Sequence, residues 1–180
     1  VAGGGTLTFP FEPVRLTVYP NPKLQVKYFW EKYVYSDDPF TPEIEPPQPF
    51  SVGLMMTSVG AGAASNVRVT SAQPKIVWND RDLLINFQLL GTEVAGAVAT
   101  PSLTAALGDI GPGQTQVARW LMTSSLQGRF IDYAVRYQHV TDLGGVVSTL
   151  IDGDPQIFEL MHVVKNQEPG ADAVPDFLTN

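Results

Sequence analysis

The sequence predicts an all-β fold, in the form of a sandwich or a barrel of short strands. Apolar and polar residues alternate along most of the chain, which is the period of a strand with one buried face. The 180 residues include 16 Gly and 15 Pro, which interrupt the alternation about every ten positions. No segment carries a helical stripe of apolar residues of useful length. Many short strands joined by turns fit these observations better than helices do.

The alternating segments place the expected strands in order along the chain. They are 6–9, 14–19, 24–35, 50–58, 66–70, 74–78, 82–91, 102–108, 115–125, 128–140 and 155–166. The segment 24–35 is long enough to need a bulge or a bend. Between it and the next strand, residues 36–49 contain five prolines and cannot hold a regular element. From the inward positions of these strands we expect a core of Val26, Tyr28, Trp30, Val52, Leu54, Met56, Val67, Val69, Ile76, Trp78, Trp120, Ile131, Tyr133 and Val135.

The chain divides into three expected parts. Residues 1–22 are an N-terminal strand segment that resembles the end of a preceding module. We expect this segment to pack, because Leu16 and Val18 alternate with polar residues and an unpaired strand exposes an aggregation-prone edge. Residues 23–166 form the β-domain, and residues 167–180, which are acidic and rich in Pro and Gly, are expected to be a linker.

Two passages carry a resemblance to a known family. "SVGAGAASNVRVTSAQP" joins an apolar strand to a second strand through a short Gly/Ala turn, and "SLTAALGDIGPGQTQVARWLMTS" places a Pro-Gly turn between two strands. These passages resemble the immunoglobulin-like repeats of bacterial surface proteins, among them the conserved-repeat domains and the bacterial cell-adhesion-related domain. The resemblance covers under half of the chain, from 50 to 125. It implies an Ig-like antiparallel β-sandwich of about 7–9 strands.

Composition argues against several classes of function. The net charge of −7 disfavours binding to nucleic acid, which needs a face rich in Lys and Arg. No apolar run is long enough for membrane insertion. The absence of cysteine rules out disulfides, thiolate catalysis and cysteine-ligated zinc. The two histidines, His139 and His162, do not have metal-ligand spacing, and no nucleophile elbow or phosphate loop is present. We therefore do not expect an enzyme.

Acidic residues of the proline-rich loop are the candidate metal ligands. Asp37, Asp38, Glu43 and Glu45 lie among prolines that restrict the loop. Calcium takes six to eight oxygen ligands from carboxylates, carbonyls and water. Two interpretations stay open for these four residues, a calcium site and solvated loop charges. Asp152 and Asp154 form a second acidic pair, which is a less favoured candidate for a metal site than the loop residues.

Aromatic residues near the first long strand are the candidate ligand-binding side chains. Trp30, Tyr33 and Tyr35 have the ring type on which sugars stack, while burial in the core is the other interpretation. Tyr33 and Tyr35 are out of phase with the alternation of 24–30 unless the strand bends between them. Exposed and roughly coplanar rings would favour sugar binding.

These observations predict a non-enzymatic structural or adhesion module of a large secreted or cell-surface protein. It would act as a spacer, a filament unit or an adhesin repeat, with neighbouring modules of the same or an identical chain as its partners. No cofactor is expected apart from calcium at the loop. Two alternatives remain open, a carbohydrate-binding module with glycans as partners, and an accessory domain of a secreted hydrolase.

Overall fold

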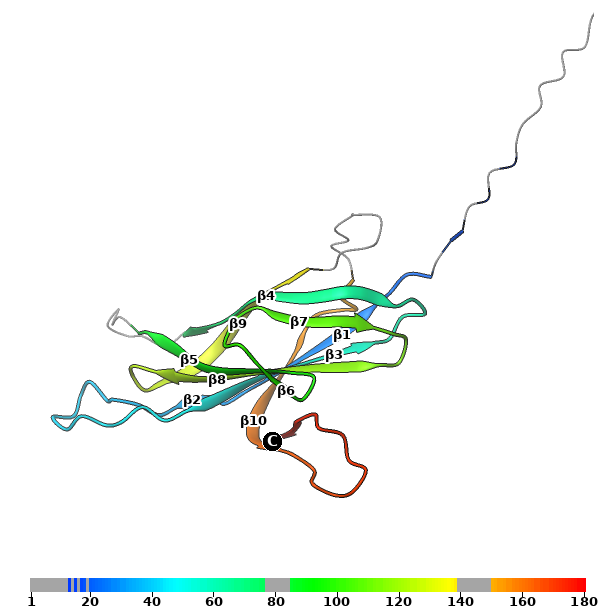
Figure 1. The fold of residues 1–180 in the computed structure, drawn as a ribbon. Coiled ribbons are helices and arrows are strands. Elements are labelled where there is room, and N and C mark those ends of the chain that lie inside the picture. The colour runs from blue at the N-terminus through cyan, green and yellow to red at the C-terminus, as the bar shows by residue number, and fades with distance from the viewer. Residues whose placement is uncertain (1–12, 14, 16, 19, 77–84, 139–149) are drawn as a thin grey trace, which may run out of the picture.

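The computed structural model describes residues 13, 15, 17, 18, 20–76, 85–138 and 150–180, with the backbone alone described at 70–76 and 130–138. Over these residues the prediction of an all-β fold is confirmed, since the chain forms eleven strands and no helix (Figure 1). In the same residues, no helix has the length and hydropathy needed to cross a bilayer.

Most of the molecule is a curled sheet of seven strands (Figure 1). Its strands in spatial order are β11 (Asp176–Thr179), β10 (Gln156–Val164), β1 (Leu24–Trp30), β3 (Phe50–Ser58), β8 (Thr115–Ser124), β5 (Phe87–Val94) and β6 (Ala97–Ala99). All neighbours in this sheet are antiparallel except β1 and β10, which run parallel. The sheet is therefore mixed, and β1, its first strand in the sequence, pairs with β10 from near the end of the chain.

The remaining strands form a second sheet of four. Its spatial order is β2 (Tyr33–Val34), β9 (Gly128–Gln138), β4 (Ala64–Ile76) and β7 (Ala105–Ile110). The bend expected within 24–35 falls at Glu31 and Lys32, where the chain leaves β1 and enters β2 in the other sheet. The alternation continues across this change of sheet, because Val34 and Ser36 are buried like the even-numbered residues of β1, so the bend does not turn Tyr33 and Tyr35 inward.

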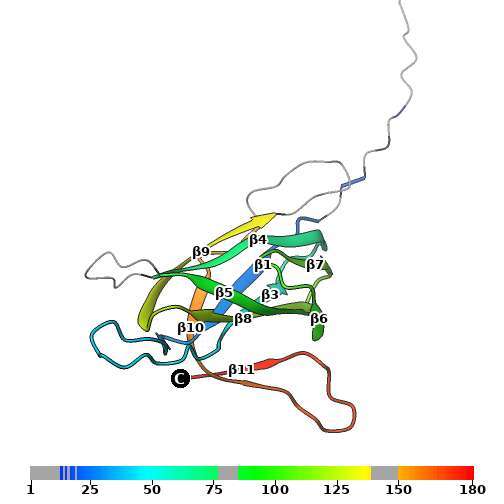
Figure 2. The ribbon, with the colours of Figure 1, turned by 60° about the vertical axis from the view of Figure 1, so that its left-hand side comes forward.

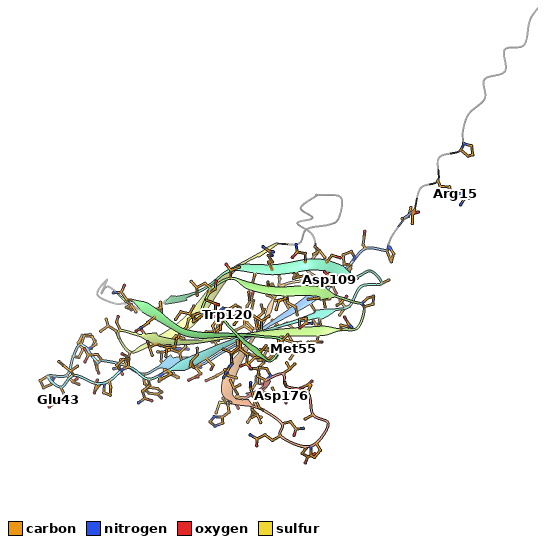
Figure 3. All side chains as sticks on the ribbon, viewed as in Figure 1. Arg15, Glu43, Met55, Asp109, Trp120 and Asp176 are labelled. Carbon is orange, nitrogen blue, oxygen red and sulfur yellow. The ribbon has the colours of Figure 1, made fainter. Side chains whose placement is uncertain are left out.

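The buried core draws on both sheets. Alternate residues of β1, β3 and β8 face inward, and Trp120 on β8 is fully buried (Figure 3). Of the expected core residues, Val26, Tyr28, Trp30, Val52, Leu54, Met56, Val67, Val69 and Trp120 are buried together. The others, Ile76, Trp78, Ile131, Tyr133 and Val135, lie outside the described side chains.

Gly60 and Gly62, in the turn of the passage 58–74, let the backbone of residues 20–23 approach this turn closely. A Cβ at Gly62 would lie 1.9 Å from the carbonyl oxygen of Pro20, and one at Gly60 would lie 2.4 Å from the amide nitrogen of Lys23. The amide of Gly62 donates to the Asn21 carbonyl at 3.3 Å. Residues 20–23 therefore dock on this turn. Of the segment before them, most lies outside the described residues, and Val18 is 89% exposed and outside any strand.

The C-terminal residues 165–179, here named the strap, turn back from β10 at the edge of the sheet and lie against the outer face of β1 and β3. Figure 2 shows β11 and the loop before it lying beneath the sheet. The Phe177 ring stacks on Phe29 of β1, with 4.5 Å between centroids. It fills the space beside Gly53 of β3, where a Cβ would lie 2.5 Å from the ring. The expectation of a linker over 167–180 differs from the structure here, because β11 pairs with β10 and Pro175 is fully buried.

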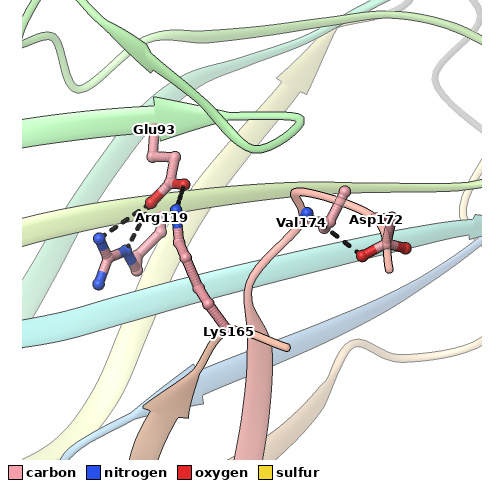
Figure 4. Close-up of polar contacts among 5 residues, drawn as sticks. All are labelled: Glu93, Arg119, Lys165, Asp172 and Val174. Carbon is pink, nitrogen blue, oxygen red and sulfur yellow. Dashed lines mark hydrogen bonds and ion pairs between the residues drawn. The ribbon is translucent and has the colours of Figure 1, made fainter. Parts of the chain in front are cut away.

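The row of residues beneath the strap explains how it is held. Strand register aligns Phe158, Phe29, Gly53, Arg119, Glu93 and Val98 across the seven-stranded sheet. Glu93 is only 5% exposed and pairs with Arg119 of β8 at 2.9 Å. Lys165 at the start of the strap forms an ion pair with the other carboxylate oxygen of Glu93 (Figure 4). Aromatic stacking at one end and an ion pair at the other thus fix the strap to the sheet.

Candidate functional site

The aromatic candidates separate into one buried ring and two exposed rings. Trp30 is 7% exposed and belongs to the core, so it presents no face to a ligand. Tyr33 and Tyr35 are 50% and 60% exposed. Val34 and Ser36 between and after them are buried, so the two tyrosines lie on the same outward side of the chain. They form the exposed part of the predicted set, at the β2 edge of the four-stranded sheet.

Two cations flank the ring of Tyr33. The Lys32 ammonium lies 5.8 Å from the ring centroid, and the guanidinium carbon of Arg129 lies 6.0 Å from it. Arg129 comes from β9, where its Cα is the register partner of Tyr33. Both distances are within the range of a cation–π interaction. We define Lys32, Tyr33, Tyr35 and Arg129 as the β2-edge site.

The two cations of this site, Lys32 and Arg129, make few other interactions among the described residues. The Nε of Arg129 is buried and makes no hydrogen bond to them. Lys32 is 3.9 Å from Glu159, which is the limit of an ion pair, and both side chains are about a third exposed. Arg129 could not be found from the sequence, because which residue of β9 lies opposite Tyr33 depends on register. Lys32 adjoins Tyr33 in sequence, but its position beside the ring depends on the bend after β1.

The carboxylates of the proline-rich loop are mostly engaged with the loop's own backbone. Asp37 accepts a hydrogen bond from the Glu45 amide at 3.1 Å, and Glu45 accepts one from the Asp38 amide at 2.8 Å. The side chain of Asp38 accepts from the Phe40 amide at 3.0 Å. Glu43 is exposed at the far tip of the loop (Figure 3). The bonds that join Asp37 and Asp38 to Glu45 therefore close the base of the loop.

No group of three or more acidic or histidine side chains in the described part of the chain is placed to hold a metal ion. The calcium interpretation of Asp37, Asp38, Glu43 and Glu45 stays a prediction. Of the second acidic pair, Asp152 forms an ion pair with Lys23 at 3.1 Å. Asp154 is exposed.

Glu31 has a shifted pKa, and His162 is one of the groups that affect it. His139 lies outside the described residues, and His162 is exposed on β10. Burial raises the pKa of Glu31, while the hydrogen bond from the Ser51 amide and the charge of His162 oppose that rise. The Ser51 amide donates to the Glu31 carboxylate at 3.0 Å. Glu31 directly follows β1, so this group helps fix the bend that carries Lys32 and Tyr33.

No family model, curated protein or solved structure matches this chain.

Proposed function

We propose that the chain is a non-enzymatic, load-bearing structural module of a larger secreted or cell-surface protein, with neighbouring modules as its partners. We propose also that its two sheets form an Ig-like β-sandwich. A core built from residues of both sheets supports the sandwich, as does the antiparallel pairing of all strand neighbours but one. The family resemblance of the 50–125 segment supports a module in a surface protein.

The parallel pairing of β1 with β10 is the observation that carries the load-bearing function. β1 is the first described strand and β10 the last but one, and they pair in register from Lys27–Gln156 to Trp30–Glu159. Tension applied at the start of β1 and the end of β10 pulls these strands in opposite directions along their axes. The hydrogen bonds between them are then loaded together in shear, instead of opening one after another.

Further contacts reinforce the start of this pair. The amide of Leu24 donates to the Leu150 carbonyl at 2.8 Å, and the amide of Asp152 donates to the Leu24 carbonyl at 2.9 Å. The Lys23–Asp152 ion pair lies at the same place. These bonds extend the parallel pairing beyond β10 itself and add to the number that must break together.

Single-molecule pulling tests the proposal, and the absence of cysteine lets two introduced cysteines define the pulling points. Handles at Asn21→Cys and Asn166→Cys load β1 and β10 in shear. Handles at Asn21→Cys and Pro155→Cys pull on the same end of both strands and peel them apart. We expect a clearly higher rupture force in the first geometry, since forced unfolding reports the barrier along the pulled direction. Equal rupture forces in the two geometries would contradict a load-bearing role.

A second function, carbohydrate binding, is favoured by the exposure of Tyr33 and Tyr35 on one side of the chain. Exposed tyrosine rings give sugars an apolar face to stack on, with little loss of side-chain entropy. The proposal predicts that a Tyr35→Ala variant loses glycan binding while its melting temperature is unchanged. A glycan array read with both proteins measures this, and a wild-type protein that binds no glycan would rule it out.

A further inference from the structure

The β2-edge site combines a free aromatic ring with two adjacent cations. Tyr33 already has Lys32 at 5.8 Å and Arg129 at 6.0 Å from its ring centroid, so its faces are partly covered. Tyr35 is more exposed, at 60%, and lies two residues further along the same side. Outward-facing residues two apart on an extended chain are about 7 Å from each other, so both rings are near enough to contact one ligand.

The charges of this site differ from those of the whole molecule. The chain has a net charge of −7, which repels polyanions in general. At this edge, however, Arg129 is partly exposed, although its Nε is buried and makes no hydrogen bond within the described residues, and Lys32 has only a distant acid partner. The positive charges of a partly exposed guanidinium and an ammonium favour a carboxylate or sulfate group, which accepts charge-assisted hydrogen bonds.

We propose that the β2-edge site binds an acidic glycan, one whose sugar units carry a carboxylate or a sulfate ester. This proposal rests on the carbohydrate-binding function above and names its ligand class. The sugar ring stacks on Tyr35, and Arg129 and Lys32 hold the acid group. Tyr33 is a positioning residue that holds the two cations beside the sugar. Salt weakens this binding, because part of it is ionic.

The experiment is a calorimetric titration of the intact chain with three glycans of similar length, an oligogalacturonate, a dextran sulfate and a neutral dextran. We expect binding of at least one acidic glycan, weaker at higher salt, and weaker or no binding of dextran. The uronate and sulfate arms show which acid group is preferred. Single-stranded DNA is a fourth ligand, and equal affinity for it would overturn the proposal by showing that the site takes any polyanion.

Matched variants assign the effect to the site. Arg129→Gln should weaken binding of the acidic glycan at least about tenfold, equivalent to about 1.4 kcal/mol. The control is Arg68→Gln, which removes the same charge from an exposed arginine of β4. Arg68 is the register partner of Gln138, at the other end of β9 and about 30 Å from Arg129. This control should bind like the wild type, and all variants are compared by circular dichroism and melting temperature.

The outcomes separate the two proposals. Neutral and acidic glycans bound equally, with a loss in Tyr35→Ala but none in Arg129→Gln, would overturn the acidic ligand and leave carbohydrate binding in place. Equal losses in Arg129→Gln and Arg68→Gln would also overturn the site, because they would show a nonspecific charge effect. Failure of both acidic glycans to bind would overturn the acidic ligand, whereas carbohydrate binding itself is refuted only when the wild-type protein also binds no glycan of the array.

Discussion

At the scale of single residues, Trp120 shows how the core joins apolar burial to hydrogen bonding. Its ring is fully buried, and its indole N–H donates to the Ser102 carbonyl at 2.9 Å. The Thr92 hydroxyl donates to the same carbonyl at 2.9 Å. The indole therefore fixes the loop after β6 as well as filling the core.

Replacing Trp120 separates these two contributions. Trp120→Ala should lower the free energy of unfolding by about 3–5 kcal/mol through the cavity that it leaves. Trp120→Phe keeps most of the volume and loses the hydrogen bond, so we expect a cost of about 1–3 kcal/mol. Urea denaturation measures both. An alanine variant with an unchanged midpoint would show that Trp120 does not lie in the core.

Glu31 is a second residue with a measurable consequence, because burial raises its pKa. A raised pKa in the folded state means that folding favours the protonated carboxyl. The resulting stabilisation is present below the pKa of the unfolded chain, about 4.3, and is lost as pH rises through the raised value. Glu31→Gln should therefore melt at a higher temperature than the wild type at pH 7, with the gap closing near pH 4. A gap that widens on acidification would contradict this sign.

At the scale of the elements, the strap depends on the glycine beneath it. A valine at Gly53 would displace the Phe177 ring, because even a Cβ would lie 2.5 Å from that ring. We expect Gly53→Val to remove the hydrogen-exchange protection of 176–179 and to lower stability by about 1–3 kcal/mol. In a Phe177→Ala background the same change should cost much less, as contacting residues are not additive. Additive losses would show that the two residues act independently.

The proline-rich loop offers an element-scale test of the two interpretations of its acids. A calcium site predicts a melting temperature several degrees higher in millimolar calcium than in EDTA. Since Asp37 and Glu45 already accept backbone hydrogen bonds, we expect identical curves. Asp37→Ala should instead lower stability by about 0.5–1.5 kcal/mol by opening the base of the loop. A calcium-dependent rise that is lost in Asp37→Ala would establish the metal site.

The elements also show what the sequence could predict. Alternation identifies which residues of a strand face inward, so the range 50–58 coincides with β3 and nine of the expected core residues are buried. Alternation does not predict which strands pair with each other in a sheet. The parallel pairing of β10 with β1 and the register of Arg129 with Tyr33 depend on contacts between distant parts of the chain. β11 is four residues long and follows a Pro- and Gly-rich run, and its position depends on a ring that fits beside Gly53.

At the scale of the whole molecule, the proposed sites occupy separate places. The β2-edge site lies on the four-stranded sheet, whereas the paired β1 and β10 belong to the seven-stranded sheet. The chain passes from one to the other within two residues, at Glu31 and Lys32. A ligand at the β2 edge would thus be attached directly to the end of β1, the strand that we propose to carry load.

The antiparallel pairing of β11 with β10 gives the molecule an extensible end. Tension at Asn180 opens β11 from β10 one pair at a time, starting near Glu159, whose carbonyl accepts from the Asn180 amide. Residues 166–180 then extend by about 50 Å before the shear-loaded strands bear the force. The module would lengthen at low tension, recoil when the Phe177 ring reseats, and resist further stretch. Over that first step it would behave as a short spring in series with a stiff link, and it would absorb a sudden pull before the core unfolds.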